Sequence, residues 1–169
     1  MSVMKSLSLC AMAALALVIT GCISGRDPLV LDPVGPVHAS TSKKSDAGFL
    51  TVYSAYDANA HFYSRKYDGR EFSDYSIFDA NGRFLRKIHN STDSIIEAPA
   101  TVSLPPGQYK VIARANGYGD VTVPVIIERD QQTVLHLEGG ETAPELAGAD
   151  SSNKVRLPDG SIVGFRSNP

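Results

Sequence analysis

The chain has 169 residues, of which 43% are hydrophobic, and a formal net charge of −2. This length predicts one domain with appendages, because a single core of about 90–100 residues accounts for only part of the chain. The 16 basic residues nearly balance the 18 acidic ones, and no basic stretch is longer than Lys43-Lys44. Composition therefore argues against a nucleic-acid partner.

The first 21 residues form a predicted signal helix, with one charge at Lys5 and an apolar run from Leu7 to Ile19. This run is too short to span a membrane comfortably, and it ends in small residues. Its end, Ile19-Thr20-Gly21-Cys22, resembles the bacterial lipobox, where a signal peptide is cut before a lipidated cysteine. The resemblance implies that Cys22 carries the lipid that holds the protein on the membrane. The alternatives are a plain signal peptide and a membrane helix with an incidental cysteine.

Residues 22–47 contain three prolines, clustered Ser and Thr, and no amphipathic period. We predict a lipidated flexible tether with a root-mean-square reach of roughly 25–30 Å, long enough to lift a domain clear of the headgroups. Cys10 lies in the leader, so Cys22 is the one cysteine left after cleavage, and no intramolecular disulfide is expected.

From residue 48 onward, apolar and polar side chains alternate in short runs, which is the pattern of half-buried antiparallel strands. The runs predicted as strands are 49–56, 72–79, 82–89, 100–104, 109–116, 121–128 and 133–137. Turn sequences such as Asn81-Gly82 and Asn116-Gly117 separate them. About seven strands at short spacing predict an all-β antiparallel sandwich over residues 48–138.

The longest strand pair carries a resemblance. The run Leu104-Pro105-Pro106-Gly107-Gln108-Tyr109-Lys110-Val111, followed by Ala113, Ala115 and Gly117-Tyr118, is similar to the LPPGxYxVxAxAxGY signature of carboxypeptidase regulatory-like and PEGA-like modules. Such modules are transthyretin-like or immunoglobulin-like sandwiches common in bacterial envelope proteins, and they rarely carry catalysis. The resemblance covers about 40 residues and implies the fold more than the function. Within it, Pro124 has no N–H to donate and predicts an edge strand or a bulge.

Residues 139–153 are rich in Gly, Ala, Glu, Asp and Ser and are predicted to be a linker. In residues 154–169, two short apolar runs flank Pro158-Asp159-Gly160, which predicts a C-terminal hairpin tail. Because an isolated hairpin is marginally stable, this tail must dock either on its own sandwich or on a partner.

No catalytic or metal-binding constellation is visible in the sequence. No two histidines have ligand spacing, no serine lies in a G-x-S-x-G elbow, and there is no phosphate-binding loop. The run Asp79-Ala80-Asn81-Gly82 is similar to the start of a calcium loop but lacks the later acidic positions, which favours a turn. We therefore expect no enzymatic activity, no metal and no cofactor.

One loop region, residues 61–72, combines aromatic and basic side chains. Exposed tyrosine and arginine are favoured at binding surfaces for protein or sugar. The candidate ligand-binding residues are Tyr63, Arg65, Tyr67 and Arg70. In the alternative interpretation, Phe62, Tyr63 and Phe72 only plug one end of the sandwich.

These observations predict a lipid-anchored, non-catalytic β-sandwich of the bacterial cell envelope. Ile23 rather than Asp follows the lipidated cysteine, which resembles outer-membrane lipoproteins facing the periplasm or the surface. The module would bind or scaffold an envelope protein or a polysaccharide, with the membrane contacted through the lipid on Cys22. The alternative function is an accessory subunit that positions a separate carbohydrate-active enzyme or peptidase.

Overall fold

The computed structural model describes residues 28–36, 38–39, 46–56, 71–90, 98–139 and 151–167. These residues form strands and turns with one short 3-10 turn, Ser151–Asn153, and no α-helix. The all-β prediction is therefore confirmed. Within the same ranges, the chain forms no helix with the length and apolar character needed to cross a bilayer.

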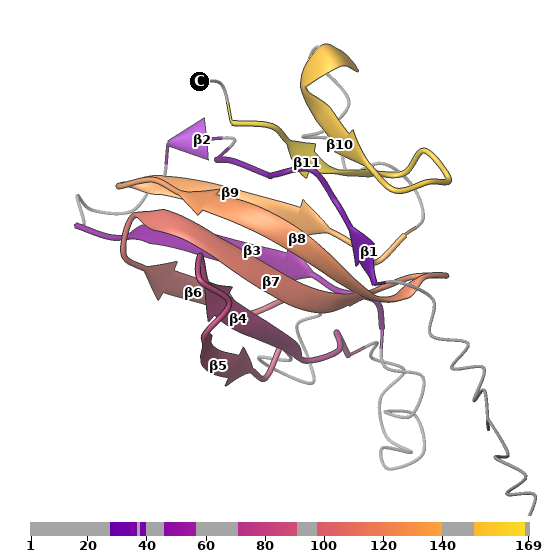
Figure 1. Cartoon of the computed structure of the whole chain (residues 1–169), viewed down its shortest axis with the longest axis horizontal. Coiled ribbons are helices and arrows are strands. Elements are labelled where there is room, and N and C mark those ends of the chain that lie inside the picture. The colour runs from indigo at the N-terminus through magenta and orange to yellow at the C-terminus, as the bar shows by residue number, and fades with distance from the viewer. Residues whose placement is uncertain are drawn as a thin grey trace, which may run out of the picture.

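Two sheets make up the sandwich (Figure 1). In spatial order, the five-stranded sheet contains β1 (Leu29–Val30), β8 (Gly119–Ile127), β7 (Gly107–Ala115), β4 (Tyr75–Asp79) and β5 (Phe84–Ile88). The four-stranded sheet contains β2 (His38–Ala39), β9 (Gln131–His136), β3 (Gly48–Tyr53) and β6 (Thr101–Leu104). A separate hairpin is formed by β10 (Lys154–Arg156) and β11 (Ile162–Phe165).

The core lies between the inner faces of the two sheets, and alternation places its side chains there. β7 and β8 pair antiparallel from Gly107↔Ile127 to Ala115↔Gly119. Every second residue of this pair is buried, as the sequence predicts. The buried residues of the pair are Val111, Ala113, Ala115, Val121, Val123, Val125 and Ile127. The other sheet contributes inward residues from β3 and β9, among them Leu50, Val52 and Leu135, which are fully buried.

Most strand pairs are antiparallel, but two are parallel, which the sequence does not predict. β3 runs parallel to β9, and β1 runs parallel to β8. Parallel neighbours require a crossover connection. Between β3 and β9 the chain passes through the five-stranded sheet twice, with β6 in between. The four-stranded sheet is consequently held together by residues far apart in the sequence.

The segment before β3 joins the two sheets, and we call residues 28–36 and 38–39 the strap. Its first part follows β8, where Val34 N–H donates to Pro124 O (2.9 Å) and Val34 O accepts from Ile126 N–H (2.8 Å). Its last part, β2, pairs with β9 in the other sheet. The sequence predicts a flexible tether here, but the burial of Leu31 and Val34 in the core fixes this part of it on the sandwich.

The pairing between the strap and β8 also explains how the sheet accommodates Pro124. β8 has β7 on one side and only the strap on the other. The pairing of strap and β8 is interrupted between Val30 and the bridge of Val34 with Val125. This interruption lies beside the proline, which accepts a hydrogen bond but has none to donate.

The C-terminal hairpin docks on its own sandwich, which decides between the two alternatives for this tail. Val155, Leu157 and Val163 are buried in the common core. Gly35 N–H of the strap donates to Phe165 O (2.8 Å). A Cβ atom on Gly164 would lie 2.6 Å from Val34 Cγ1, so this close approach requires glycine.

Candidate functional site

The residues predicted to bind a ligand, Tyr63, Arg65, Tyr67 and Arg70, lie outside the described residues, and so does Cys22. The structure does show both points at which the loop with these four ligand-binding candidates joins the sandwich. Tyr56 and Phe72 form an isolated antiparallel bridge. The two ends of this loop are therefore held side by side.

An aromatic cluster surrounds the two loop ends. Phe72 stacks on Tyr56 with ring centroids 4.9 Å apart, and it meets the edge of Tyr53 at 5.6 Å. Tyr53 in turn stacks on His136, with centroids 4.6 Å apart and planes at 7°. Phe72 is 5% exposed. For Phe72 the plug interpretation is therefore correct, while Phe62 and Tyr63 lie outside the described residues.

The sequence does not indicate the surroundings of His136. Its Nδ1 lies 2.8 Å from Glu138 Oε1, and the imidazole is 8% exposed. The signal was the i, i+2 spacing of His136, the last residue of β9, and Glu138, which follows the strand. The carboxylate fixes the orientation of the ring that stacks on Tyr53. Within the described part of the chain, no three His, Cys, Asp or Glu residues gather to hold a metal ion.

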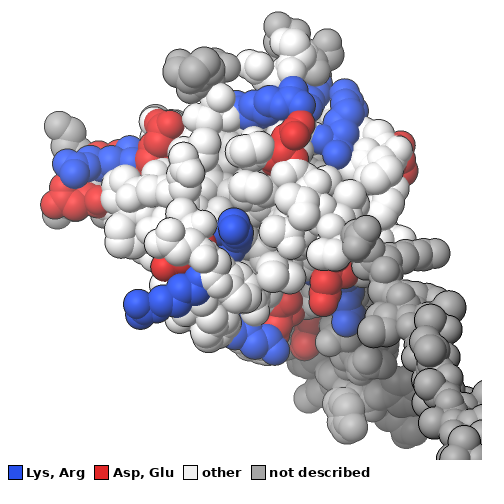
Figure 2. Space-filling model, viewed as in Figure 1, with Lys and Arg blue, Asp and Glu red and all other residues white. Residues whose placement is uncertain are grey.

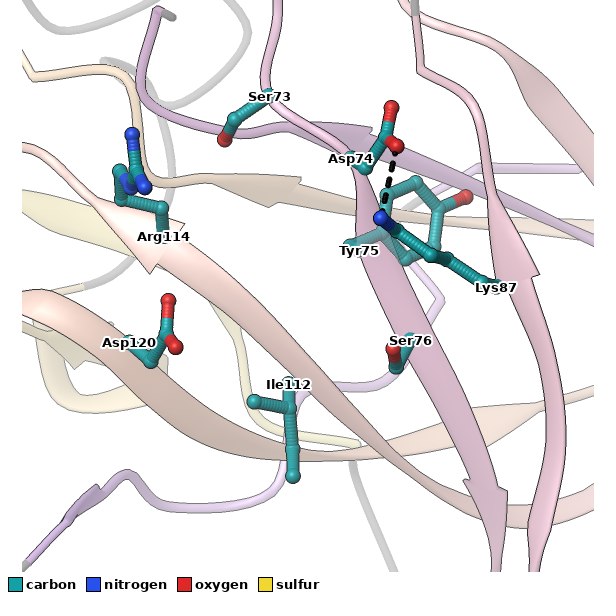
Figure 3. A pocket seen from close by; sticks show the side chains of 8 residues that line it. All are labelled: Ser73, Asp74, Tyr75, Ser76, Lys87, Ile112, Arg114 and Asp120. Atoms are coloured by element: carbon teal, nitrogen blue, oxygen red, sulfur yellow. Dashed lines mark ion pairs between the residues drawn. The ribbon is translucent and has the colours of Figure 1, made fainter.

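A polar hollow on the outer face of the five-stranded sheet is a second site that the sequence did not indicate. We call it the outer-face pocket; its volume is about 320 Å³. Figure 3 shows the eight residues that line it. They are Ser73, Asp74, Tyr75, Ser76, Lys87, Ile112, Arg114 and Asp120. A possible signal was the polar side of the alternation in β7 and β8, which puts Arg114 opposite Asp120 in the ladder.

One side of the outer-face pocket is an ion-pair group centred on Asp74. Its two carboxylate oxygens lie 3.0 Å from Lys87 Nζ and 2.9 Å from His89 Nδ1. Partial burial raises the pKa of Asp74, but hydrogen bonds and positive charge from Lys87 and His89 outweigh it and leave the pKa below its usual value. On the other side, neither Arg114 nor Asp120 forms an ion pair with any residue the structure describes.

The remaining surface is mixed. Phe84 and Leu85 on the edge strand β5 are 54% and 40% exposed, and Phe84 contacts Phe78 edge-to-face at 5.6 Å. On the face drawn in Figure 2, basic and acidic side chains are interspersed and do not gather into one large patch of a single sign. This distribution suits specific local contacts better than attachment to a polyanion.

Comparison with protein families shows which family the sandwich belongs to. The model of a family described as fimbrillin-A associated anchor proteins Mfa1 and Mfa2 matches residues 44–143, more than half of the chain. The chain belongs to this family. The fimbrillin-A associated anchor family is a family of the bacterial cell envelope, in agreement with the envelope location expected from the sequence. No curated protein and no solved structure matches the chain.

The match of the anchor family runs from the segment before β3 to the segment after β9. It therefore covers both sheets except the two short strands of the strap, and it leaves out the C-terminal hairpin. No carboxypeptidase regulatory-like or PEGA-like module is matched. The similarity of residues 104–118 to that signature is thus a local likeness of a strand pair, and the anchor family replaces it as the family of this chain.

Proposed function

We propose that this protein is a lipid-anchored, non-catalytic anchor subunit that holds a fimbrial protein to the bacterial envelope. The observation that supports this function is the family match over β3–β9, because its family is described by association with fimbrillin-A and by anchoring. A protein partner is accordingly favoured over a polysaccharide and over a role as accessory subunit of an enzyme.

The anchor in this proposal is lipid on Cys22. The lipobox resemblance at residues 19–22 supports it. Each buried methylene contributes about 0.8 kcal/mol, and two or more acyl chains give stable attachment to a bilayer. We assign the protein to the outer membrane, facing the periplasm or the surface, on the identity of Ile23.

The binding residues in this proposal are those of the loop between Tyr56 and Phe72. Tyr63, Arg65, Tyr67 and Arg70 supply large amphipathic and cationic side chains, which commonly dominate the energy of protein interfaces. The aromatic cluster supports the loop at its base, since Tyr56 and Phe72 are bridged and packed. Fixed loop ends lower the entropy that binding must overcome.

A fatty-acid label tests the anchor. Cells that express the full chain with an alkyne-tagged fatty acid should yield labelled protein in the membrane fraction. The variant Cys22→Ala should be unlabelled, whereas Cys10→Ala should be labelled like wild type. Absence of label on wild type, or label that persists on Cys22→Ala, would refute lipidation at this residue.

Crosslinking tests the partner. The full chain should crosslink to a fimbrial subunit of the same cell, and the variant Tyr63→Ala/Arg65→Ala/Tyr67→Ala should lose at least 10-fold of the crosslinked product while it melts like wild type. A matched control is Asn81→Ala/Arg83→Ala, two exposed residues at the opposite end of β4. Equal crosslinking by the triple variant and wild type would remove the loop from the proposal.

A further inference from the structure

The outer-face pocket exists because two neighbouring strands of the sheet separate. β4 and β7 are paired as far as Ser76↔Ile112. Beyond this point Ala55, two residues after the end of β3, lies between the two chains: its N–H donates to Arg114 O (2.8 Å) and its O accepts from Ser73 N–H (3.0 Å). The two strands are therefore separated by one more chain at the level of Ser73 and Arg114, both of which line the pocket.

The hollow contains a polar side chain without a partner. Ser73 is 8% exposed, and its Oγ makes no hydrogen bond within the part of the chain that the structure describes. Its neighbour Ser54 instead bonds the backbone, since Ser54 Oγ donates to Ser73 O (2.6 Å). An unpaired buried hydroxyl is unfavourable, because it has lost its hydrogen bonds to water. Ser73 lines the pocket, but its Oγ is itself shielded from the hollow, so the hydroxyl meets a ligand there only after rotation of the side chain.

Figure 3 shows how the charged groups divide around the hollow. The Asp74–Lys87 pair occupies one side, where the two charges neutralise each other at a distance of 3.0 Å. Arg114 and Asp120 occupy the other side, and Ser73 and Ile112 lie between the two groups. The pocket charges that form no ion pair with a described residue are therefore one cation and one anion on adjacent strands.

This arrangement selects against ligands of a single sign. An anion that reaches Arg114 also meets Asp120 and Asp74, and a cation that reaches Asp120 also meets Arg114 and Lys87. A group that carries both charges satisfies both sides. Because directly opposed residues of an antiparallel pair have Cβ atoms about 4.5–5.5 Å apart, Arg114 and Asp120 start from neighbouring points on the sheet, and one small ligand can span them.

We propose that the outer-face pocket binds the zwitterionic head of an α-amino acid, with its carboxylate on Arg114 and its ammonium group on Asp120. After rotation about its Cα–Cβ bond, Ser73 donates a third hydrogen bond to the carboxylate, and Ile112 packs against the ligand carbon atoms. The proposal is independent of the fimbrial partner and of the lipid, because it uses only residues of the described sandwich.

Two sources present this head group: a free amino acid, and a diamino acid joined to a cell-wall peptide through its other end. Calorimetric titration of the full chain in detergent separates them. Glycine and D-alanine report on the free amino acid, and a soluble cell-wall tripeptide with a terminal diaminopimelate reports on the attached one. Tighter binding of either probe supports the proposal and shows whether the pocket takes the free or the attached amino acid.

Charge-deleted analogues test the zwitterion requirement on the unmodified protein. N-acetylglycine lacks the ammonium group and glycinamide lacks the carboxylate, and each should bind at least 10-fold more weakly than glycine. Equal binding of either analogue, or no binding by the amino acids and the tripeptide at 10 mM (on the order of 3 kcal/mol or less), would overturn the proposal. Tighter binding of O-phosphoethanolamine than of glycine would also overturn it, in favour of a lipid headgroup.

Substitutions locate the site. Arg114→Gln and Asp120→Asn should each weaken the binding of the tighter probe at least 10-fold, and Ser73→Ala should weaken it about 3-fold to 10-fold, in line with a single hydrogen bond. Lys110→Gln is the matched control, because Lys110 is on the same strand, is also exposed and does not line the pocket. Unchanged affinity in both Arg114→Gln and Asp120→Asn, with unchanged melting, would place the ligand elsewhere.

Discussion

At the scale of single residues, two buried polar side chains differ in their hydrogen bonding: Asn90 has several partners, and the Tyr75 hydroxyl has none among the described residues. Asn90 is fully buried and uses both ends of its amide: Nδ2 donates to Val52 O (2.8 Å) and Oδ1 accepts from Ala100 N–H (3.1 Å). Tyr75 is 1% exposed, yet its hydroxyl has no partner among the described residues. The first side chain ties the ends of three strands together, whereas the second fills volume with its ring.

Replacement of Tyr75 by Phe should stabilise the protein. It removes an unpaired buried hydroxyl and keeps the ring, so the free energy of unfolding should rise by about 0.5–2 kcal/mol. Urea denaturation at pH 7 measures this change. Tyr109→Phe is the control, because the Tyr109 hydroxyl donates to Pro105 O (2.8 Å) and its loss should not stabilise. A lower unfolding free energy for Tyr75→Phe would mean that the hydroxyl is satisfied.

The same residue should make stability depend on alkaline pH. Burial raises the pKa of Tyr75 well above its ordinary value of 10.0, with a small opposing effect from Arg86. A raised pKa means that the folded state holds the proton more tightly, so this contribution is complete below pH 10 and decreases as the pH rises above it. Between pH 10 and 12, wild type should therefore lose more stability than Tyr75→Phe. Parallel curves for the two proteins in urea would contradict this.

Asn90→Ala should be strongly destabilising. The substitution leaves Val52 O, Ser54 Oγ and Ala100 N–H without this partner, since Asn90 Nδ2 also donates to Ser54 Oγ (2.9 Å). We expect a decrease of about 2–4 kcal/mol in the free energy of unfolding. Asn81→Ala in the exposed β4–β5 turn should change it by less than about 0.5 kcal/mol. Equal effects at the two positions would show that the buried amide is not needed.

At the scale of elements, the contact between strap and C-terminal hairpin closes one edge of the sandwich. Gly35 bridges Phe165, and Gly164 lies against Val34. In Figure 1 the hairpin lies beside the strap above β9. The two segments come from opposite ends of the chain and pack against each other. The local sequence of one segment therefore cannot specify the contact without the other.

Gly164→Ala should loosen this contact. The added Cβ would lie 2.6 Å from Val34 Cγ1 and 3.0 Å from Val134 O, and overpacking of a core costs about 1–3 kcal/mol. Faster proteolysis within residues 139–169 and a lower melting temperature should accompany the loss. Lys154→Ala in the same hairpin should leave both unchanged. A variant that resists proteolysis like wild type would show that the strap moves aside without cost.

At the scale of the whole molecule, strap, sandwich and hairpin share one core. They should therefore unfold in one transition. Removal of residues 154–169 takes Val155, Leu157 and Val163 out of this core, at about 1.5–3 kcal/mol for each side chain. Calorimetry of the truncated protein should show a melting temperature lower by more than about 10 °C. An unchanged melting temperature, or two separate transitions in the full chain, would show that the hairpin is an independent unit.

The sequence predicts the parts of this molecule that depend on local pattern. Alternation in residues 109–128 identifies β7 and β8, and Asn81-Gly82 identifies the β4–β5 turn, where Gly82 N–H donates to Asp79 O (3.0 Å). The strap was missed because its order comes from β8 and the hairpin rather than from a period of its own. The apolar residues Leu31 and Val34 were the only local sign that the strap is buried.

The candidate sites were harder to predict than the strands. The outer-face pocket depends on Ala55 entering between two strands, and no pattern around Ala55 indicates this position. Its charged residues, Asp74, Lys87, Arg114 and Asp120, come from four segments that only the sheet order brings together. The loop with Tyr63 and Arg65 was chosen by composition, and its role in binding stays a prediction.

The strap limits how far this protein can stand from a bilayer. If lipid is attached at Cys22, only six peptide units separate it from Pro28, a fully extended span of about 20 Å. β1 begins beside Val121, next to Asp120, so such a lipid would keep the end of the sandwich with the outer-face pocket nearest the headgroups. The turn at Asn81 lies at the far end of β4 and faces outward. With that attachment, molecules that reach the pocket would have to enter the thin layer between the domain and the membrane.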